Sequence, residues 1–131
     1  KEAIKAHLDS SGYEIEDLGA HWYDGEDDYP DFIRPVAEAV AKDPNNRGII
    51  MGGSGQGEAM CANRVKGIRA VVYYGGPDDI IKLSRQHNNA NILSFGARFI
   101  SEEEALIVLD VWLSLPFEGD RHQQRIDKLD E

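Results

Sequence analysis

The sequence predicts an α/β fold in which helices cover both faces of a parallel sheet. Three short apolar runs, each bounded by turn-forming residues, have the pattern of buried strands: 49–51, 68–73 and 91–95. Segments with helical periodicity separate these runs, and this alternation is typical of doubly wound α/β proteins. Ligands in such folds bind where the strands end. We therefore expect a site at the loops that follow Met51, Tyr73 and Phe95.

The chain before the first of these strands is expected to add a helix and an edge strand. Residues 1–10 place apolar side chains on one helical face, and Ser11-Gly12 ends that helix. Residues 13–18 alternate imperfectly between apolar and acidic side chains, which predicts a strand at the edge of the sheet. Residues 19–29 form a loop that is rich in acidic and aromatic residues.

Helices are expected before, between and after the buried strands. Pro30 suits the first position of one helix, and Pro35 either kinks that helix or marks its true start. A helix should open at about Gly57, and residues 78–86 should form another. A capping box at residues 101–104 opens a helix that runs to about residue 114. Residues 119–129 should form a last, highly polar helix.

Length, charge and cysteine content limit the classes of function. A chain of 131 residues predicts a single domain over residues 1–131, large enough for its own core. The net charge of −10 and the pI of about 4.8 argue against a nucleic-acid partner. The single cysteine, Cys61, fits a reducing cytoplasm. The best apolar run, 105–115, is too short to cross a bilayer and is interrupted by Asp110. We expect a cytoplasmic protein with no membrane partner.

The first buried strand leads into a segment with four glycines in six residues. These glycines are Gly52, Gly53, Gly55 and Gly57. Glycine lets a ligand approach the backbone, and the free N–H groups of the following helix favour an anion there. A tight strand-to-helix turn is the simpler alternative, but Ser54 and Glu58 among the glycines favour a ligand loop. The candidate binding residues of this loop are Gly53, Ser54, Gly55, Gln56 and Gly57.

The loop matches neither of the two common glycine motifs. A P-loop has Lys followed by Ser or Thr after its last glycine, whereas Glu58 follows here. A dinucleotide fingerprint has its third glycine at the position that Glu58 occupies. An acid at this point would repel nucleotide phosphates, and it is better placed to accept a proton from a carbon or hydroxyl. The alternative is that Glu58 only stabilises the start of a helix.

Other candidates are ambiguous on the residues alone. His87 ends a predicted helix and by itself suits a capping or surface position, and His122 suits the edge of the core or the surface. Arg121 and Arg125 are four residues apart, so they share a helix face and could hold a phosphate. A solvated helix with pairs to Asp120 or Asp127 explains the two arginines equally well.

The acidic and aromatic residues of the 19–29 loop do not predict a metal site. The acidic stretch 24–28 lacks the EF-hand order, and no cluster of histidine or cysteine completes a site, so we expect a solvated loop without metal. His21 is expected at the edge of the core or the surface, whereas Trp22 and Trp112 are expected to serve in packing.

Several motifs become specific when they are taken together in their order along the chain. They are 53–57 with 62–70, 85–93 with 96–98, the tail 117–126, and Tyr29-Pro30-Asp31-Phe32. In this order they resemble type B ribose-5-phosphate isomerases, a family that includes galactose-6-phosphate and allose-6-phosphate isomerases. The resemblance covers nearly the whole chain. It implies a flavodoxin-like three-layer α/β/α sandwich, active sites shared between the subunits of a homodimer or a tetramer, and no metal or cofactor.

The resemblance also implies roles for individual residues. One branch of the family has a cysteine base at the position of Gly52, and the other uses a glutamate just after the loop, which Glu58 matches. Glu58 is therefore the expected base, and Cys61 is expected to be a small buried hydrophobe. The family gives His87 the acid–base role in opening the sugar ring and gives Asn88 a contact to the substrate.

Further residues follow from the same resemblance. Arg121 and Arg125 would hold the phosphate, with Arg98 as a third candidate, and Tyr29 would line the sugar pocket. The loop amides and Ser54 would hold the oxygens of the enediolate. The family begins with a strand that carries an Asp-His pair. That strand would precede Lys1, so we expect it to be missing from this sequence and further residues to lie ahead.

The expected function is the interconversion of ribose 5-phosphate and ribulose 5-phosphate through a cis-enediolate. One alternative is isomerisation of a six-carbon sugar phosphate. Another is a non-catalytic module of the same fold that binds a sugar phosphate or a nucleotide. Glu58 separates these classes, because a module that only binds phosphate gains nothing from an acid beside its anion loop.

Overall fold

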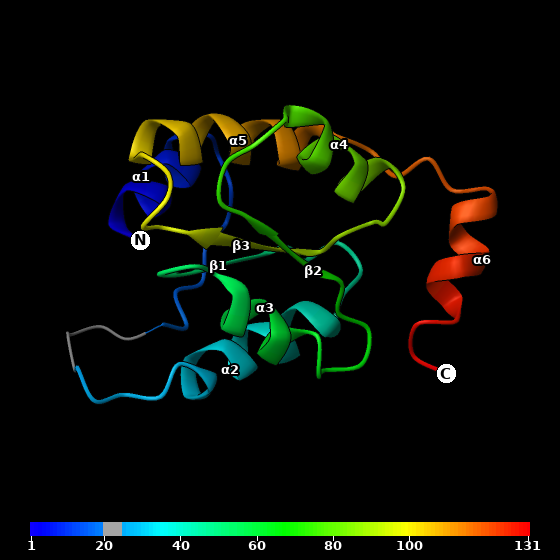
Figure 1. The fold of residues 1–131 in the computed structure, drawn as a ribbon, viewed down its shortest axis with the longest axis horizontal. Coiled ribbons are helices and arrows are strands. Elements are labelled where there is room, and N and C mark those ends of the chain that lie inside the picture. Colours follow the sequence, from blue (N-terminus) through cyan, green and yellow to red (C-terminus); the bar gives the residue numbers. More distant parts are fainter. Residues whose placement is uncertain (20–24) are drawn as a thin grey trace.

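The computed structural model describes residues 1–19 and 25–131 and has three layers (Figure 1). Its middle layer is a parallel sheet of β1 (Gly48–Gly52), β2 (Ala70–Tyr73) and β3 (Ile92–Gly96). The strand order is β1-β3-β2, so β3 lies in the centre and is buried along its whole length. Gly52 lies opposite Gly96, and Tyr73 lies opposite Phe95. The carboxyl ends of the strands therefore meet at one edge, as expected for a parallel sheet.

Helices cover both faces of the sheet in the described part of the chain (Figure 1). One face carries α2 (Pro30–Ala41) and α3 (Gln56–Ala62). The other face carries α1 (Glu2–Ser10), α4 (Asp78–Gln86) and α5 (Glu102–Ser114). The last helix, α6 (Arg121–Asp127), lies to the side, beside the edge where the strands begin. Asp130 confirms this position, because its carboxylate accepts a 2.9 Å hydrogen bond from the Gly67 amide just ahead of β2.

Two hydrophobic clusters join the helices to the sheet. On the α5 side, Trp112 and Leu109 are fully buried against Leu93 and Phe95, so the packing role expected for Trp112 is confirmed. On the α2 side, a second cluster contains Ile33, Ala37, Val40, Ile50, Ala62, Ile68 and Ile92. Because β3 contributes to both clusters, its apolar residues are needed on both faces, and this explains the unbroken apolar run of its sequence.

The helix ends follow local sequence signals. Ser101 caps α5, and its hydroxyl accepts a 3.1 Å hydrogen bond from the Glu104 amide, as the capping box predicts. The α2 helix begins at Pro30 and continues through Pro35, so Pro35 does not mark its start. The α6 helix is shorter than the predicted 119–129, because Gly119 and Asp120 adopt positive φ angles of 76° and 53° just before it.

The strand expected over residues 13–18 does not form. This segment makes no ladder, although it runs alongside the sheet. A cavity of about 1030 Å³ lies between it and β1, lined by both segments and by the inner faces of α1 and α2. Strands pair at about 4.8 Å, so a segment held beyond that distance has no backbone partner. The further strand expected ahead of Lys1 stays a prediction.

Two other expectations concern the surface and the 19–29 loop. Within the described residues, no helix has the length and apolar character needed to cross a membrane. His21, Trp22 and Asp24 lie outside the described residues, and so do the predictions that fall on them.

Candidate active site

The glycine loop is held against the end of β3 by backbone hydrogen bonds. The Ala97 amide donates to the Gly52 carbonyl at 2.8 Å, and the Arg98 amide donates to the Gly53 carbonyl at 3.1 Å. The Ser94 hydroxyl, which is fully buried, donates to the Gly55 carbonyl at 2.7 Å. The loop is thus fixed at the carboxyl edge of the sheet, where the sequence predicts a ligand site. We call this edge, with residues 52–58, the loop end.

Gly55 shows why this loop needs glycine. Its φ angle is +77°, a region that favours glycine, and it is the residue that precedes α3. A Cβ added there would lie 3.0 Å from the backbone of Phe95. A side chain would therefore both strain the turn and push the loop away from β3. The helix that follows begins at Gln56, one residue earlier than predicted.

The Glu58 side chain folds back over the end of β1. A Cβ added to Gly52 would overlap the Glu58 carboxylate, so this carboxylate occupies the space above the Gly52 Cα. The acid and the position of the family's alternative base are therefore neighbours in space, although six residues separate them in the sequence. Cys61 lies about one helical turn after Glu58 on α3 and packs against the α2-side cluster, but it is half-buried rather than fully buried as expected.

Two more predicted residues lie beside the loop. The Arg98 side chain passes over Gly53, since a Cβ added there would lie 3.0 Å from Arg98 Nε. The Tyr29 hydroxyl reaches Gly57, whose added Cβ would lie 2.6 Å from it. Tyr29 precedes α2 and Arg98 follows β3, so separate segments converge on the loop. The structure thus brings together Tyr29, Glu58 and Arg98 with the loop residues 53–57.

The remaining predicted residues lie at the opposite edge of the sheet. The α4 helix runs back from the end of β2, so His87, which follows its last residue, lies near the start of β3 (Figure 1). A pocket of about 220 Å³ is lined by His87, Asn88, His122, Arg125, Ile126 and Leu129. Arg121 is exposed on the first turn of α6 beside it. We call this edge, with the end of α4 and residues 115–130, the tail end.

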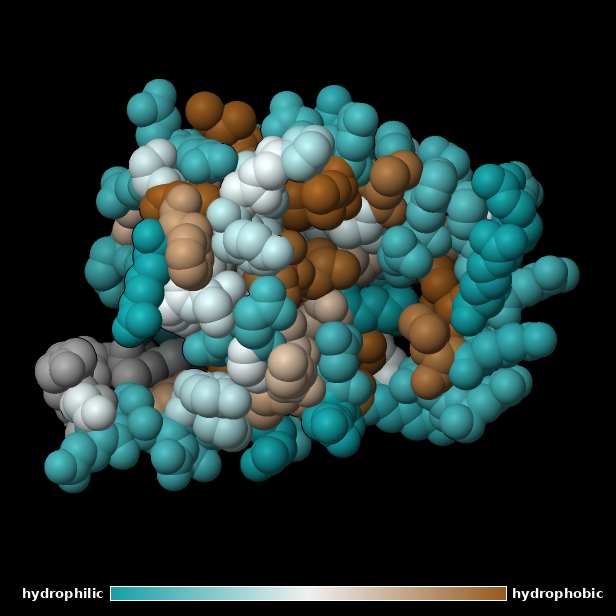
Figure 2. All heavy atoms as spheres, in the orientation of Figure 1, coloured by the Kyte–Doolittle hydropathy of each residue, from teal (hydrophilic) through white to brown (hydrophobic). Residues whose placement is uncertain are grey.

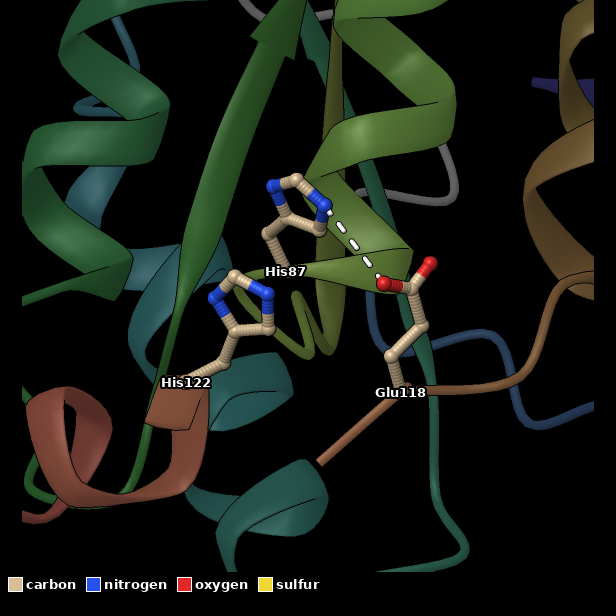
Figure 3. A group of neighbouring side chains, drawn as sticks. All are labelled: His87, Glu118 and His122. Carbon is tan, nitrogen blue, oxygen red and sulfur yellow. Dashed lines mark ion pairs between the residues drawn. The ribbon is translucent and has the colours of Figure 1, made fainter. Parts of the chain in front are cut away.

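The tail end contains a histidine pair that the sequence did not single out. The rings of His87 and His122 stack with centroids 4.1 Å apart and planes only 16° from parallel. His87 Nε2 lies 3.6 Å from the Glu118 carboxylate (Figure 3). Burial lowers the pKa of His122 below the usual histidine value, and the nearby His87 and Arg121 act in the same direction. His122 is 6% exposed, so it is buried rather than a surface residue.

The arginines of the candidate site have no acidic partner among the residues that the structure describes. Arg98, Arg121 and Arg125 make no ion pair within residues 1–19 and 25–131, although acids outnumber bases by 24 to 14 in the sequence. The Asp127 carboxylate instead accepts from the amide of Gln123 at 2.6 Å. The pairs to Asp120 or Asp127 considered as an alternative are therefore not formed, although Arg121 and Arg125 are both exposed to solvent.

The two ends are too far apart to serve one small ligand within a single chain. They are separated by the length of β3, which has five residues and spans roughly 13–16 Å. Glu58 and His87 therefore cannot touch the same carbon skeleton of a five- or six-carbon sugar in one copy. The two groups of predicted site residues thus lie at opposite ends of the strands in one chain.

The fold and the loop define a class of protein. A three-layer α/β/α sandwich with a parallel sheet and a glycine loop at its carboxyl edge is a flavodoxin-like protein with a ligand loop. The family model described as Ribose/Galactose Isomerase matches residues 1–129. The chain belongs to this family.

Individual relatives agree with the family match. The chain is 41% identical over 130 residues to a probable ribose-5-phosphate isomerase B of Mycoplasma genitalium, covering 98% of this chain and 84% of the relative. It is 42% identical over 129 residues to ribose-5-phosphate isomerase B of Escherichia coli, covering 98% of this chain and 85% of that protein. These similarities extend over nearly the whole described fold.

Solved structures show the same architecture. The crystal structure of the Mycoplasma genitalium enzyme with bound ribulose-5-phosphate has a TM-score of 0.93, and the match covers 98% of this chain and 84% of that one at 41% identity. The Thermotoga maritima ribose 5-phosphate isomerase has a TM-score of 0.89 at 40% identity, covering 98% of this chain and 87% of that one. The predicted flavodoxin-like sandwich is therefore confirmed.

Proposed function

We propose that this protein is an aldose–ketose isomerase that interconverts ribose 5-phosphate and ribulose 5-phosphate. The observation that carries the proposal is the Glu58 carboxylate, which is folded over Gly52 inside a glycine loop. A loop that only bound an anion would gain nothing from a carboxylate held at its centre. The relatives named as ribose-5-phosphate isomerases, one with ribulose-5-phosphate bound, support this substrate.

Glu58 acts as the base of the reaction. Its carboxylate removes the proton from C2 of the open-chain aldose, and the electron pair of that bond forms the C1–C2 double bond of a cis-enediolate. The same carboxyl group returns the proton to C1, which gives the ketose. Backbone N–H groups of residues 53–57 and the Ser54 hydroxyl hold the oxygens on which negative charge develops. The proton of the C2 hydroxyl passes to O1, so C1 is reduced as C2 is oxidised and no outside oxidant or reductant is needed.

The tail end supplies the other functions. His87 moves a proton at the ring oxygen of the closed sugar, so that the aldehyde becomes available to Glu58, and Asn88 contacts the substrate. Arg121 and Arg125 hold the phosphate, and the absence of internal acidic partners in the described chain leaves their donors available. Arg98 and Tyr29 border the sugar from the loop end.

A second copy of the chain completes each site. Since the two half-sites lie at opposite edges of the sheet, the loop end of one copy must meet the tail end of its partner. Apolar side chains are exposed near this contact. They are Ile80 and Leu83 on α4, where Figure 2 shows hydrophobic surface, and Tyr74 and Phe99 in the segments after β2 and β3. A homodimer with shared sites, or a tetramer built from it, would cover them. A cytoplasmic location stays a prediction.

Steady-state kinetics on the purified protein test the proposed reaction. We expect isomerisation of ribose 5-phosphate, with a lower kcat/KM for six-carbon aldose phosphates. Higher kcat/KM for a six-carbon substrate would assign the protein to that reaction instead. Binding of ribose 5-phosphate without turnover, and without exchange of its C2 proton with solvent deuterium, would identify a non-catalytic module.

A further inference from the structure

The stacked histidine pair is held by contacts between segments that are distant in the sequence. The Glu118 amide donates to the Gln86 carbonyl at 2.9 Å, just before His87. One residue earlier, the buried Arg85 donates through Nε to the Leu115 carbonyl at 3.3 Å. These bonds fix the chain after α5 to the last turn of α4. The Glu118 carboxylate and the His122 ring are thereby delivered to the two sides of the His87 imidazole (Figure 3).

The turn before α6 sets the direction of the His122 ring. Gly119 and Asp120 both have positive φ angles, and the His122 amide donates to the Gly119 carbonyl at 3.1 Å. This turn leads directly into α6, whose first turn places His122 against the end of α4. The His122 ring then covers one face of the exposed His87 ring, whereas His122 itself is buried.

Burial and the charges around the pair favour the neutral form of His122. The charged and titratable groups that face it are His87 from α4, Glu118 from the turn, and Arg121 and Arg125 from its own helix. Burial is the main cause of its lowered pKa, and three of these four groups add to it. Two stacked imidazolium rings would repel each other at 4.1 Å. A neutral His122 can stay in contact with His87 whether His87 is protonated or not.

Metal binding is the other use for two histidines and a glutamate. Their ligand atoms all lie within 4.8 Å of one another. An imidazole nitrogen binds a metal along its lone pair, which lies in the ring plane, so an ion shared by two rings must lie in both planes. Rings that stack nearly parallel with centroids 4.1 Å apart share no such position. The arrangement therefore suits support of one ring by the other and does not suit chelation.

We propose that His122 is a positioning residue for His87: its buried ring is the platform that holds the His87 imidazole with Nε2 toward Glu118 for proton transfer at the ring oxygen of the sugar. This inference rests on the proposed function. It predicts a defect limited to opening of the closed sugar. The later proton transfer between C2 and C1 belongs to Glu58 at the loop end and should not depend on His122.

Ribulose 5-phosphate allows the two steps to be measured separately. Its C5 oxygen is esterified, so the ketose cannot close to a furanose and reaches the base in open-chain form. Exchange of its C1 hydrogen with solvent deuterium therefore requires Glu58 and the loop but no ring opening. Turnover of ribose 5-phosphate requires both steps. The ratio of the two rates reports on ring opening alone.

The test compares His122→Ala, His122→Phe and a control, Gln124→Ala, which changes an exposed residue of the same helix. Misplacing an acid–base group reduces its contribution strongly, so we expect His122→Ala to lower kcat for ribose 5-phosphate about tenfold or more. KM and the C1 exchange rate should stay within about threefold. His122→Phe keeps a planar ring on His87 and should recover kcat to within about threefold. Gln124→Ala should match the wild type.

Three results would overturn the inference in folded protein of unchanged oligomeric state. They are a normal kcat in His122→Ala, a kcat in His122→Phe as low as in His122→Ala, and a loss of C1 exchange or a large rise in KM that parallels the loss of turnover. The proposed function fails differently, since the wild-type protein would then neither isomerise ribose 5-phosphate nor exchange the C1 hydrogen of ribulose 5-phosphate.

Discussion

The loop end and the tail end of the sheet are built by different means. At the loop end, backbone groups do the positioning: amides of residues 97 and 98 donate to the loop carbonyls, and glycines allow the close approach. At the tail end, side chains do the positioning, through the stacked rings of His87 and His122 and the bonds of Arg85. The proposed base is therefore held by a backbone frame, whereas the proposed ring-opening group depends on a contact that a single substitution removes.

The largest effect is expected at the loop end, from Glu58→Gln. Glutamine keeps the shape but cannot accept a proton, so kcat should fall by about 10²–10⁴ while KM changes little. Exchange of the C2 proton of the substrate with solvent deuterium should stop. Cys61→Ala is the control, since Cys61 lies on the same helix but packs in the core, and it should keep near-normal kcat. Loss of exchange in Cys61→Ala but not in Glu58→Gln would reverse the assignment.

A mixing experiment sharpens the comparison between the two ends. Glu58→Gln and His87→Ala each disable one half-site and should each be nearly inactive. In a mixed dimer, one site combines both intact halves and the other combines both defects. Random association should therefore restore about a quarter of wild-type activity after co-expression. A mixture no more active than its components would place both residues in one chain's own site and refute the shared arrangement.

A smaller effect is expected from Arg125→Ala at the tail end. Loss of a charge-assisted hydrogen bond to the phosphate costs about 1.5–3 kcal/mol, which corresponds to a rise in KM of roughly 10- to 100-fold. The kcat should change much less. Lys128→Ala is a matched control, because it removes a positive charge from the exposed position that follows α6. Equal KM values in steady-state kinetics for Arg125→Ala and the wild type would remove α6 from the phosphate site.

The smallest expected effect is a loss of local stability in α6 at acidic pH. The pKa of His122 is lowered in the folded protein, so the unfolded segment binds more protons as pH falls below about 6.5. Stability that depends on His122 is thus present at neutral pH and decreases as pH falls through that value. Amide protection factors in α6 should be lower at pH 5.5 than at pH 7.5, and those in β1 and β3 should change less. An equal decrease in His122→Phe would assign the effect to His87, Glu118 or other groups.

The two ends also differ in how far the sequence could predict them. Periodicity and turn residues predict the three buried strands and the helices, because those signals are local. Glycine spacing predicts the loop for the same reason. The prediction of an edge strand over residues 13–18 was wrong, because alternation of apolar and acidic side chains does not show whether a partner strand lies within pairing distance. The contact of His122 with His87 spans 35 residues and depends on a turn with two positive φ angles, which no local pattern of side chains announces.

The roles of the site residues were available from the sequence only through the family resemblance. Spacing alone could not decide whether Glu58 is a catalytic base or only stabilises the start of a helix. Nor could it decide whether Arg121 and Arg125 bind a phosphate or belong to a solvated helix face. The structure adds what spacing lacked, namely the carboxylate folded over Gly52 and the absence of acidic partners for both arginines within the described residues. The roles themselves stay predictions.

The contact between Gly52 and the Glu58 carboxylate also bears on how the two branches of the family could have diverged. A glycine codon becomes a cysteine codon by one nucleotide change. Because a Cβ at residue 52 would overlap the flexible end of Glu58, that change would push the carboxylate aside without disturbing the backbone. The same change would introduce a thiol and displace the carboxylate from its present position over residue 52. A chain with cysteine at 52 could therefore keep Glu58 only with its carboxylate in another position.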